Sequence, residues 1–147
     1  MSPNHWILNG KEFTDSTGYY GMVYCITHKE TGKKYIGRKY FSKYKIQKKT
    51  KRKKKLRVES DWQSYYGSSA DLLEDVKKYG NDAFTREIIR LCISRSETNY
   101  YEAFYILTSG ALLSDNFYNK WVSLKLHAST LKHLQEKGGS HEPPPSL

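Results

Sequence analysis

Two tyrosines in this chain are spaced so that their hydroxyls could act on one substrate. Tyr24 ends the tripeptide Met22-Val23-Tyr24, Tyr35 begins Tyr35-Ile36-Gly37, and ten residues separate the two tripeptides. A tyrosine hydroxyl is a poor base at its free pKa of about 10, but a nearby cation lowers that pKa and makes proton abstraction feasible. Both tripeptides lie in strand-like runs around the turn-like segment 29–32. The pattern therefore predicts a hairpin that carries both tyrosines on one small sheet.

The remaining pattern predicts the elements around this hairpin. After strands at 21–27 and 33–37, a helix is expected at 70–79, with Ser68 or Ser69 as its N-cap and Gly80 as its end. A third strand follows at 84–91, and Ser94 and Glu97 form a capping-box pattern that opens a helix at 95–109. A short helix is expected at 124–136. This order of elements predicts an α+β fold with a small sheet flanked by helices rather than a βαβ alternation.

A length of 147 residues fits one domain. We expect a loosely held N-terminal arm over 1–20, a folded domain over 21–136 and a disordered tail over 137–147, which is rich in Gly, Ser and Pro. Cys25 and Cys92 lie in apolar runs and are expected to be buried free thiols, which favours a reducing, intracellular setting such as the cytoplasm of a host or producing cell. No run is long and apolar enough to span a membrane.

The positive charge of the chain is concentrated in one segment. The net charge is +10, and residues 43–57 contain ten Lys or Arg and no Asp or Glu. A neutral body with one basic segment is typical of a protein that binds a polyanion, and nucleic acid is the leading candidate. A solvated loop or a localisation signal is the alternative for the segment taken alone. The predicted nucleic-acid-binding residues are Lys43, Lys45, Lys48, Lys49, Lys51, Arg52, Lys53, Lys54, Lys55 and Arg57.

The tyrosine pair, together with two residues further along, resembles the GIY-YIG nuclease family. The spacing of the tripeptides matches the family pattern, although Met22-Val23 stands in place of Gly-Ile. Glu102 lies on the predicted second helix, where the family places its glutamate, and Asn119 follows where the family has an asparagine near the site. The resemblance covers roughly 21–121. It implies a three-stranded antiparallel sheet flanked by helices, here with the basic segment inserted after the second strand.

The resemblance also implies roles for individual residues. Glu102 would hold Mg²⁺ or Mn²⁺, Tyr24 would be the general base, and Tyr35 would orient the water or the scissile phosphate. Asn119 would lie close to the site. An arginine should contact the phosphate through its planar fork. Arg38, directly after the second tripeptide, is the first choice for this arginine, and Arg57 is the alternative.

We therefore expect a metal-dependent DNA endonuclease, closest to the phage-type homing enzymes. The stretch after Trp121 is too short for the separate recognition domain that homing members usually carry. This favours relaxed specificity, a restriction-type homodimer or a partner that provides specificity. A non-catalytic nucleic-acid-binding module on the same fold and a structure-selective repair nuclease are the alternatives. Only the set of Tyr24, Tyr35 and Glu102 distinguishes the enzyme from the binding module, because a binding module has no need of a carboxylate that faces a polyanion.

Overall fold

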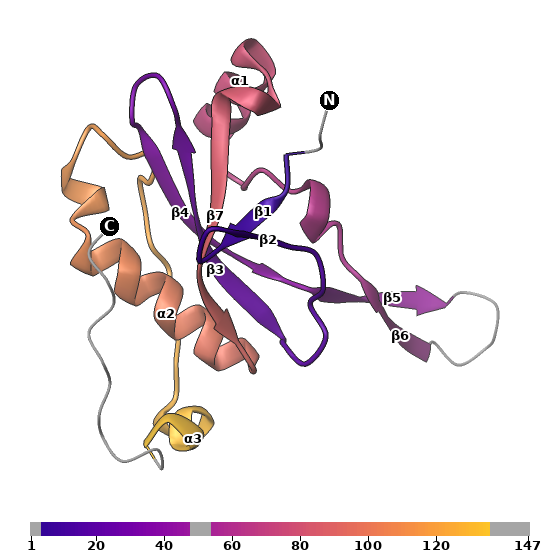
Figure 1. The fold of residues 1–147 in the computed structure, drawn as a ribbon. Helices are drawn as coiled ribbons and strands as arrows, with labels where there is room; N and C mark the ends of the chain where they lie inside the picture. The colour runs from indigo at the N-terminus through magenta and orange to yellow at the C-terminus, as the bar shows by residue number, and fades with distance from the viewer. Residues whose placement is uncertain (1–3, 48–53, 136–147) are drawn as a thin grey trace.

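The computed structural model describes residues 4–47 and 54–135, which form a mixed α+β domain (Figure 1). Its main sheet has five strands in the order β2-β1-β7-β3-β4, and β5 and β6 pair as a separate hairpin. The strands are β1 Trp6–Leu8, β2 Lys11–Phe13, β3 Gly21–His28, β4 Lys34–Tyr40, β5 Ser42–Gln47, β6 Lys54–Glu59 and β7 Phe84–Cys92. The helices are α1 Ala70–Tyr79, α2 Arg95–Thr108 and α3 Lys132–Gln135, with 3₁₀ turns at Trp62–Ser64, Asn81–Ala83, Ala111–Leu113 and Ala128–Leu131.

The predicted tyrosine hairpin is confirmed and forms the middle of the main sheet. β3 pairs antiparallel with β4 on one side and with β7 on the other, and Tyr24 lies opposite Gly37. Alternate side chains of β3 enter different cores, since successive residues of a strand point to opposite faces. Met22, Tyr24 and Ile26 join the core that includes α1, whereas Val23 and Cys25 join the core beneath α2. Both faces of the central sheet are therefore buried.

The two longer helices begin and end where the sequence predicts. The side chain of Ser69 accepts a hydrogen bond from the Leu72 N–H, and Gly80 follows the last residue of α1. Ser94 Oγ accepts a hydrogen bond from the Glu97 N–H at 3.1 Å. Glu97 Oε2 in turn accepts one from the Ile93 N–H at 3.0 Å, one residue before the cap. These caps satisfy N–H groups that the helices leave free.

The expected loose N-terminal arm is wrong for residues 6–13, and so is the expected sheet of three strands. β1 and β2 form a hairpin, and β1 adds to β7 in parallel, which extends the sheet to five strands. Trp6 anchors this hairpin because its ring is 1% exposed and its Nε1 donates to the Trp62 carbonyl at 2.6 Å. Asn9 and Gly10 both have positive φ, as a tight two-residue hairpin turn requires.

The basic segment begins and ends in a β-hairpin that extends away from the main sheet (Figure 1). β5 follows β4 after a single residue, Phe41, and pairs with β6 in regular antiparallel register. Five of the predicted nucleic-acid-binding residues lie outside the described residues: Lys48, Lys49, Lys51, Arg52 and Lys53.

The C-terminal part of the domain packs against α2. Of the helix expected at 124–136, the structure has a 3₁₀ turn at Ala128–Leu131 and the short α3, whose Leu134 is buried beneath α2. The tail predicted at 137–147 lies outside the described residues. Cys25 and Cys92 are buried free thiols, as predicted. None of the helices among residues 4–47 and 54–135 is both long and apolar enough to cross a lipid bilayer.

Candidate active site

The candidate site lies at the free edge of β4, the last strand of the main sheet. The β-strand alternation places Tyr35 and Gly37 on the face that carries Tyr24, and Arg38 on the face that carries Val23. A pocket of about 800 Å³ opens at this edge. Its lining includes four predicted site residues and two additional aromatic residues: Tyr35, Arg38, Glu102, Asn119, Tyr65 and Trp121.

Tyr24 is not a lining residue of this pocket, but its ring packs near the Tyr35 and Tyr65 rings that are. Its ring is 6.2 Å from that of Tyr35 and 6.0 Å from that of Tyr65, between centroids. The Tyr24 hydroxyl is buried and has no hydrogen-bond partner among the described residues. A Cβ at Gly37 would lie 2.4 Å from this hydroxyl oxygen, so only glycine leaves room for it at that position. The glycine of the second tripeptide thus fixes where the first tyrosine places its hydroxyl.

Burial raises the pKa of both tyrosines, to different degrees. The pKa of Tyr24 is raised well above its ordinary value because the fully buried phenolate would be desolvated, and the nearby Tyr65 and Tyr35 add to the effect. The pKa of Tyr35 is also raised by burial, but its hydroxyl is hydrogen-bonded to Ser68 Oγ at 3.1 Å, which opposes the shift. Neither tyrosine is a ready base in this state, and Tyr24 is the more strongly protonated of the two.

Arg38 and Glu102, which both line the pocket, form a close ion pair. Arg38 Nη1 donates to Glu102 Oε1 at 2.6 Å, and the two side chains are 35% and 15% exposed. Burial raises the pKa of Glu102, and the positive charge of Arg38 opposes that shift. Arg57 lies elsewhere, at the base of the β5–β6 hairpin, where its Nε donates to Ser42 Oγ at 2.7 Å. Of the two arginines predicted from the sequence, Arg38 is therefore the one in the pocket.

Asn119 attaches a C-terminal segment to the exposed edge of β4. Its Oδ1 accepts from the Ile36 N–H at 2.9 Å, and its Nδ2 donates to the Ile36 carbonyl at 2.8 Å. The Lys34 N–H and carbonyl bind the backbone of Asn116 and Tyr118 in the same way, at 2.9 and 2.7 Å. Asn119 thus lines the pocket, and both polar atoms of its side chain are bound to the backbone of Ile36.

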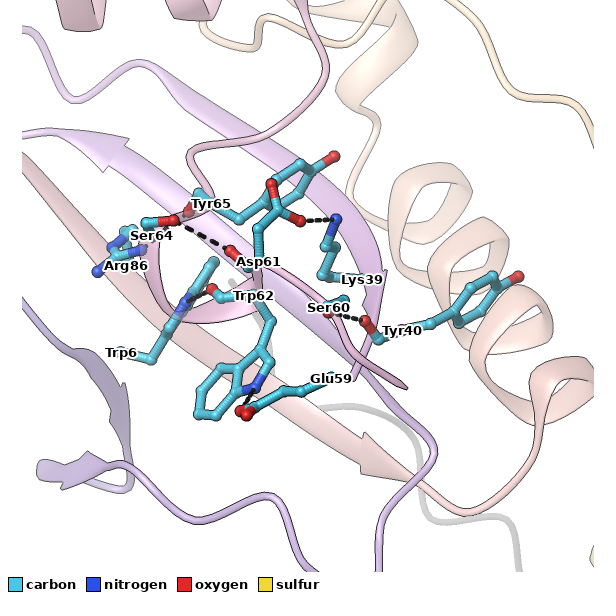
Figure 2. Close-up of polar contacts among 10 residues, drawn as sticks. All are labelled: Trp6, Lys39, Tyr40, Glu59, Ser60, Asp61, Trp62, Ser64, Tyr65 and Arg86. Atoms are coloured by element: carbon cyan, nitrogen blue, oxygen red, sulfur yellow. Dashed lines mark hydrogen bonds and ion pairs between the residues drawn. The ribbon is translucent and has the colours of Figure 1, made fainter. Parts of the chain in front are cut away.

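A loop between β6 and α1 contributes Tyr65, a residue that the sequence analysis did not assign to the site. Figure 2 shows the polar contacts that hold this loop. Lys39 Nζ lies 4.1 Å from the centre of the Tyr65 ring and 2.7 Å from Asp61 Oδ1. Trp62 and Tyr66 of the same loop are buried in the core. The adjacent aromatic pair Tyr65-Tyr66 was the only sequence signal for Tyr65.

Arg86 of β7 supports the same loop from below, and no pattern in the sequence indicated it. Its Nη1 donates to the carbonyls of Gln63 and Tyr65 at 3.0 and 2.9 Å, and its Nη2 donates to that of Asn4. The guanidinium lies between the rings of Trp6 and Tyr66, 4.7 and 4.3 Å from their centres. This buried cation therefore binds three carbonyl groups and orients the strand-to-helix loop.

Three basic residues of the hairpin are exposed to solvent. Lys43, Lys45 and Arg57 are exposed, and β5 continues directly from the strand that carries Tyr35 and Arg38. Lys54 and Lys55 lie in β6. The structure thus places the described basic residues in an arm that starts next to the pocket, with none of them in its lining.

A divalent cation at this pocket would need oxygen ligands. No three His, Cys, Asp or Glu side chains gather into a metal centre within the described parts of the chain. The pocket lining has two carboxylates, Glu102 and Asp71, and includes the hydroxyls of Tyr35 and Ser68. Asp71 is paired with Lys120 at 2.6 Å, so Glu102 is the carboxylate that lies beside Arg38. Mg²⁺ prefers hard oxygen ligands, keeps several waters and is often bound through one or two carboxylates together with substrate phosphates. The residues present fit a cation held in this way.

One family of known proteins matches most of the chain. Residues 6–122 match the family model described as "Putative endonuclease segE, GIY-YIG domain". No curated protein and no solved structure matches the chain. The family match begins at Trp6, so it includes the N-terminal hairpin as well as the tyrosine strands, α2 and Asn119. Since it covers most of the 147 residues, the chain belongs to the segE-type GIY-YIG endonuclease family.

Proposed function

We propose that this protein is a divalent-cation-dependent endonuclease that hydrolyses phosphodiester bonds in DNA. The observation that carries the proposal is the Arg38–Glu102 pair, 2.6 Å apart, in a pocket beside Tyr35 and close to Tyr24. A half-buried carboxylate facing a polyanion would only weaken a binding module. The same carboxylate is useful to an enzyme that has to hold a cation next to a phosphate.

The phosphate would be held by Arg38. Its guanidinium can donate two parallel hydrogen bonds to a phosphate, which lysine cannot reproduce. When Arg38 turns to a phosphate, the Glu102 carboxylate loses its present partner and can hold Mg²⁺ or Mn²⁺. A cation bound there would polarise the phosphate and stabilise the leaving oxygen.

The attacking water would be handled by the two tyrosines. The buried Tyr24 hydroxyl has no partner among the described residues, so a water that reaches it could bind there. We assign the Tyr24 phenolate, the minor form of this side chain near neutral pH, as the base that takes a proton from the attacking water and becomes the neutral hydroxyl. The Tyr35 hydroxyl would orient the water or the phosphate. Asn119 holds the β4 backbone between Tyr35 and Gly37, so its role here is to position the strand.

The β5–β6 hairpin would lie along the DNA backbone. Its lysines and arginines would supply affinity that is independent of sequence and sensitive to salt. If the protein recognises a particular DNA sequence, as phage-type homing enzymes do, that specificity would come from a second copy of the chain or from a partner.

Incubation of supercoiled plasmid with the purified protein tests the proposed function. We expect nicked or linear product with Mg²⁺ or Mn²⁺ and none after addition of a chelator. Linear duplex, branched and single-stranded DNA should be included, because the alternatives include structure-selective cleavage. Binding to all these DNAs without cleavage, in every divalent cation tried, would favour the non-catalytic binding module.

A further inference from the structure

Trp121 is a large aromatic side chain that the proposed chemistry does not use. The chain has three tryptophans. Trp6 and Trp62 are each 1% exposed, in the core, whereas Trp121 is 75% exposed and lines the pocket at the edge of β4. Burial of a tryptophan ring removes a large apolar surface from water and stabilises the fold. The exposed ring of Trp121 contributes little of this free energy. Its position in the lining of the pocket that holds Arg38 leaves the flat apolar face of the ring for a ligand.

The backbone on both sides holds Trp121 in place. Asn119, two residues earlier, is bound to both backbone groups of Ile36 at 2.9 and 2.8 Å. Lys120 Nζ pairs with Asp71 Oδ2 of α1 at 2.6 Å, and Val122 packs against the core beneath α2. Two residues of extended chain span about 7 Å, so Trp121 stays close to the β4 residue that follows Tyr35. The ring is therefore presented beside the pocket by a segment fixed on both sides.

We propose that Trp121 is a stacking platform for an unstacked nucleobase next to the phosphate that is cleaved. This inference rests on the proposed function, since it assumes that a DNA phosphate occupies the pocket beside Arg38. The face of a base can meet a tryptophan ring only when the base has left the duplex stack or was never paired. A pocket of about 800 Å³ lies within the range of cavities that enclose small ligands. The preferred substrate would therefore carry an unpaired nucleotide at the cleavage position.

Intrinsic tryptophan fluorescence can report this contact directly, because the only other tryptophans are buried. We expect a duplex oligonucleotide with one unpaired nucleotide to quench the fluorescence of the wild-type protein more strongly than the fully paired duplex does. Trp121→Phe should abolish that quenching while it retains most of the binding. Trp121→Ala should weaken binding of the unpaired-nucleotide duplex roughly tenfold or more, as loss of one stacked base typically does. Leu113→Ala is the matched control, because Leu113 is 94% exposed and lies outside the pocket lining.

The inference is overturned if the fluorescence does not respond to either duplex, or if Trp121→Ala binds and cleaves both duplexes as the wild type does. In that case cleavage that still depends on Glu102 would leave the proposed function intact. Conversely, quenching through Trp121 without cleavage in any divalent cation would support the stacking site and contradict the proposed function. Trp121→Ala is expected to fold normally, since its side chain is largely outside the core, and a thermal melt checks this.

Discussion

The Arg38 guanidinium donates to the Glu102 carboxylate at 2.6 Å, and this pair joins the tyrosine hairpin to α2. Burial raises the pKa of Glu102, whereas the charge of Arg38 lowers it. Without the guanidinium the carboxylate would keep the desolvation penalty and lose its compensation. The pair therefore keeps Glu102 ionised at pH values where a partly buried glutamate would begin to take up a proton.

Arg38→Met should raise the pKa of Glu102 further. A raised carboxyl pKa favours the protonated form, so Glu102 would need a higher pH to become a cation ligand. Titration of ¹³C-labelled glutamate side chains by NMR measures the shift, with Arg57→Met as the control at the base of the hairpin. An unchanged Glu102 titration in Arg38→Met would show that the ion pair does not control this carboxylate.

Tyr24→Phe should lower the cleavage rate and leave the fold as stable or more stable. The substitution removes a buried hydroxyl that has no partner, which should stabilise the fold by about 1 kcal/mol. Because the pKa of Tyr24 is raised, most of the hydroxyl is protonated near neutral pH, and the wild-type rate should increase about tenfold per pH unit. Tyr24→Phe should lose that slope, whereas Tyr35→Phe should keep it. The measurements are cleavage rates and thermal melts of the wild type, Tyr24→Phe and Tyr35→Phe between pH 6 and 9. A Tyr24→Phe protein that keeps the full cleavage rate would exclude Tyr24 as the base.

The sequence predicted those parts of the fold that local signals determine. Ser69 and Gly80 delimit α1, and Ser94 and Glu97 open α2, because capping depends on residues a few positions apart. The N-terminal hairpin was missed because each of its strands has only three residues, too few for an alternating pattern to be recognised. Its one local signal was the Asn9-Gly10 turn. Such a turn predicts a hairpin, but it does not predict that the hairpin pairs with β7 in the main sheet.

The candidate site was predicted only in part, because its contacts join distant segments. The spacing of Tyr24 and Tyr35 indicated their shared sheet, but the bond from the Ile36 N–H to Asn119 spans 83 positions. Arg86 lies in a strand, and its three carbonyl partners belong to distant segments of the chain. The residues next to it in the sequence do not indicate these contacts. Such long-range polar contacts depend on the tertiary fold, and no periodicity in the sequence encodes them.

Arg86→Lys should destabilise the protein by about 2–4 kcal/mol, because lysine cannot serve three carbonyl groups and leaves buried acceptors unpaired. Arg95→Lys, at an exposed position on α2, should change the stability by no more than about 0.5 kcal/mol. Urea unfolding followed by circular dichroism measures both. Equal stability of the two variants would mean that the contacts of Arg86 do not hold the loop that carries Tyr65.

Neutralising residues 51–55, which are all Lys or Arg, should flatten the salt dependence of DNA binding. Each phosphate contact contributes about −0.9 to the slope of log K against log salt concentration. A control variant with Lys11, Lys77 and Lys78 replaced by Gln should keep the wild-type slope, since these exposed lysines lie outside the basic segment. Fluorescence anisotropy with one duplex over a range of salt concentrations gives the slopes. A wild-type slope in the neutralised protein would mean that this segment does not touch phosphates.

Replacement of Glu102 by Gln is the sharpest test of metal-dependent cleavage, because it removes the lining carboxylate that pairs with Arg38 and leaves the other, Asp71, paired with Lys120. The measurement is the rate of plasmid cleavage in Mg²⁺ by wild type, Glu102→Gln and Glu12→Gln, with DNA affinity measured in parallel. Glu12 is exposed on β2, at the opposite edge of the sheet from β4, and serves as the matched control. We expect Glu102→Gln to bind DNA as well as the wild type does but to cleave no plasmid. Glu12→Gln should cleave at the wild-type rate. Cleavage by Glu102→Gln at the wild-type rate would contradict the role of Glu102 as the cation ligand.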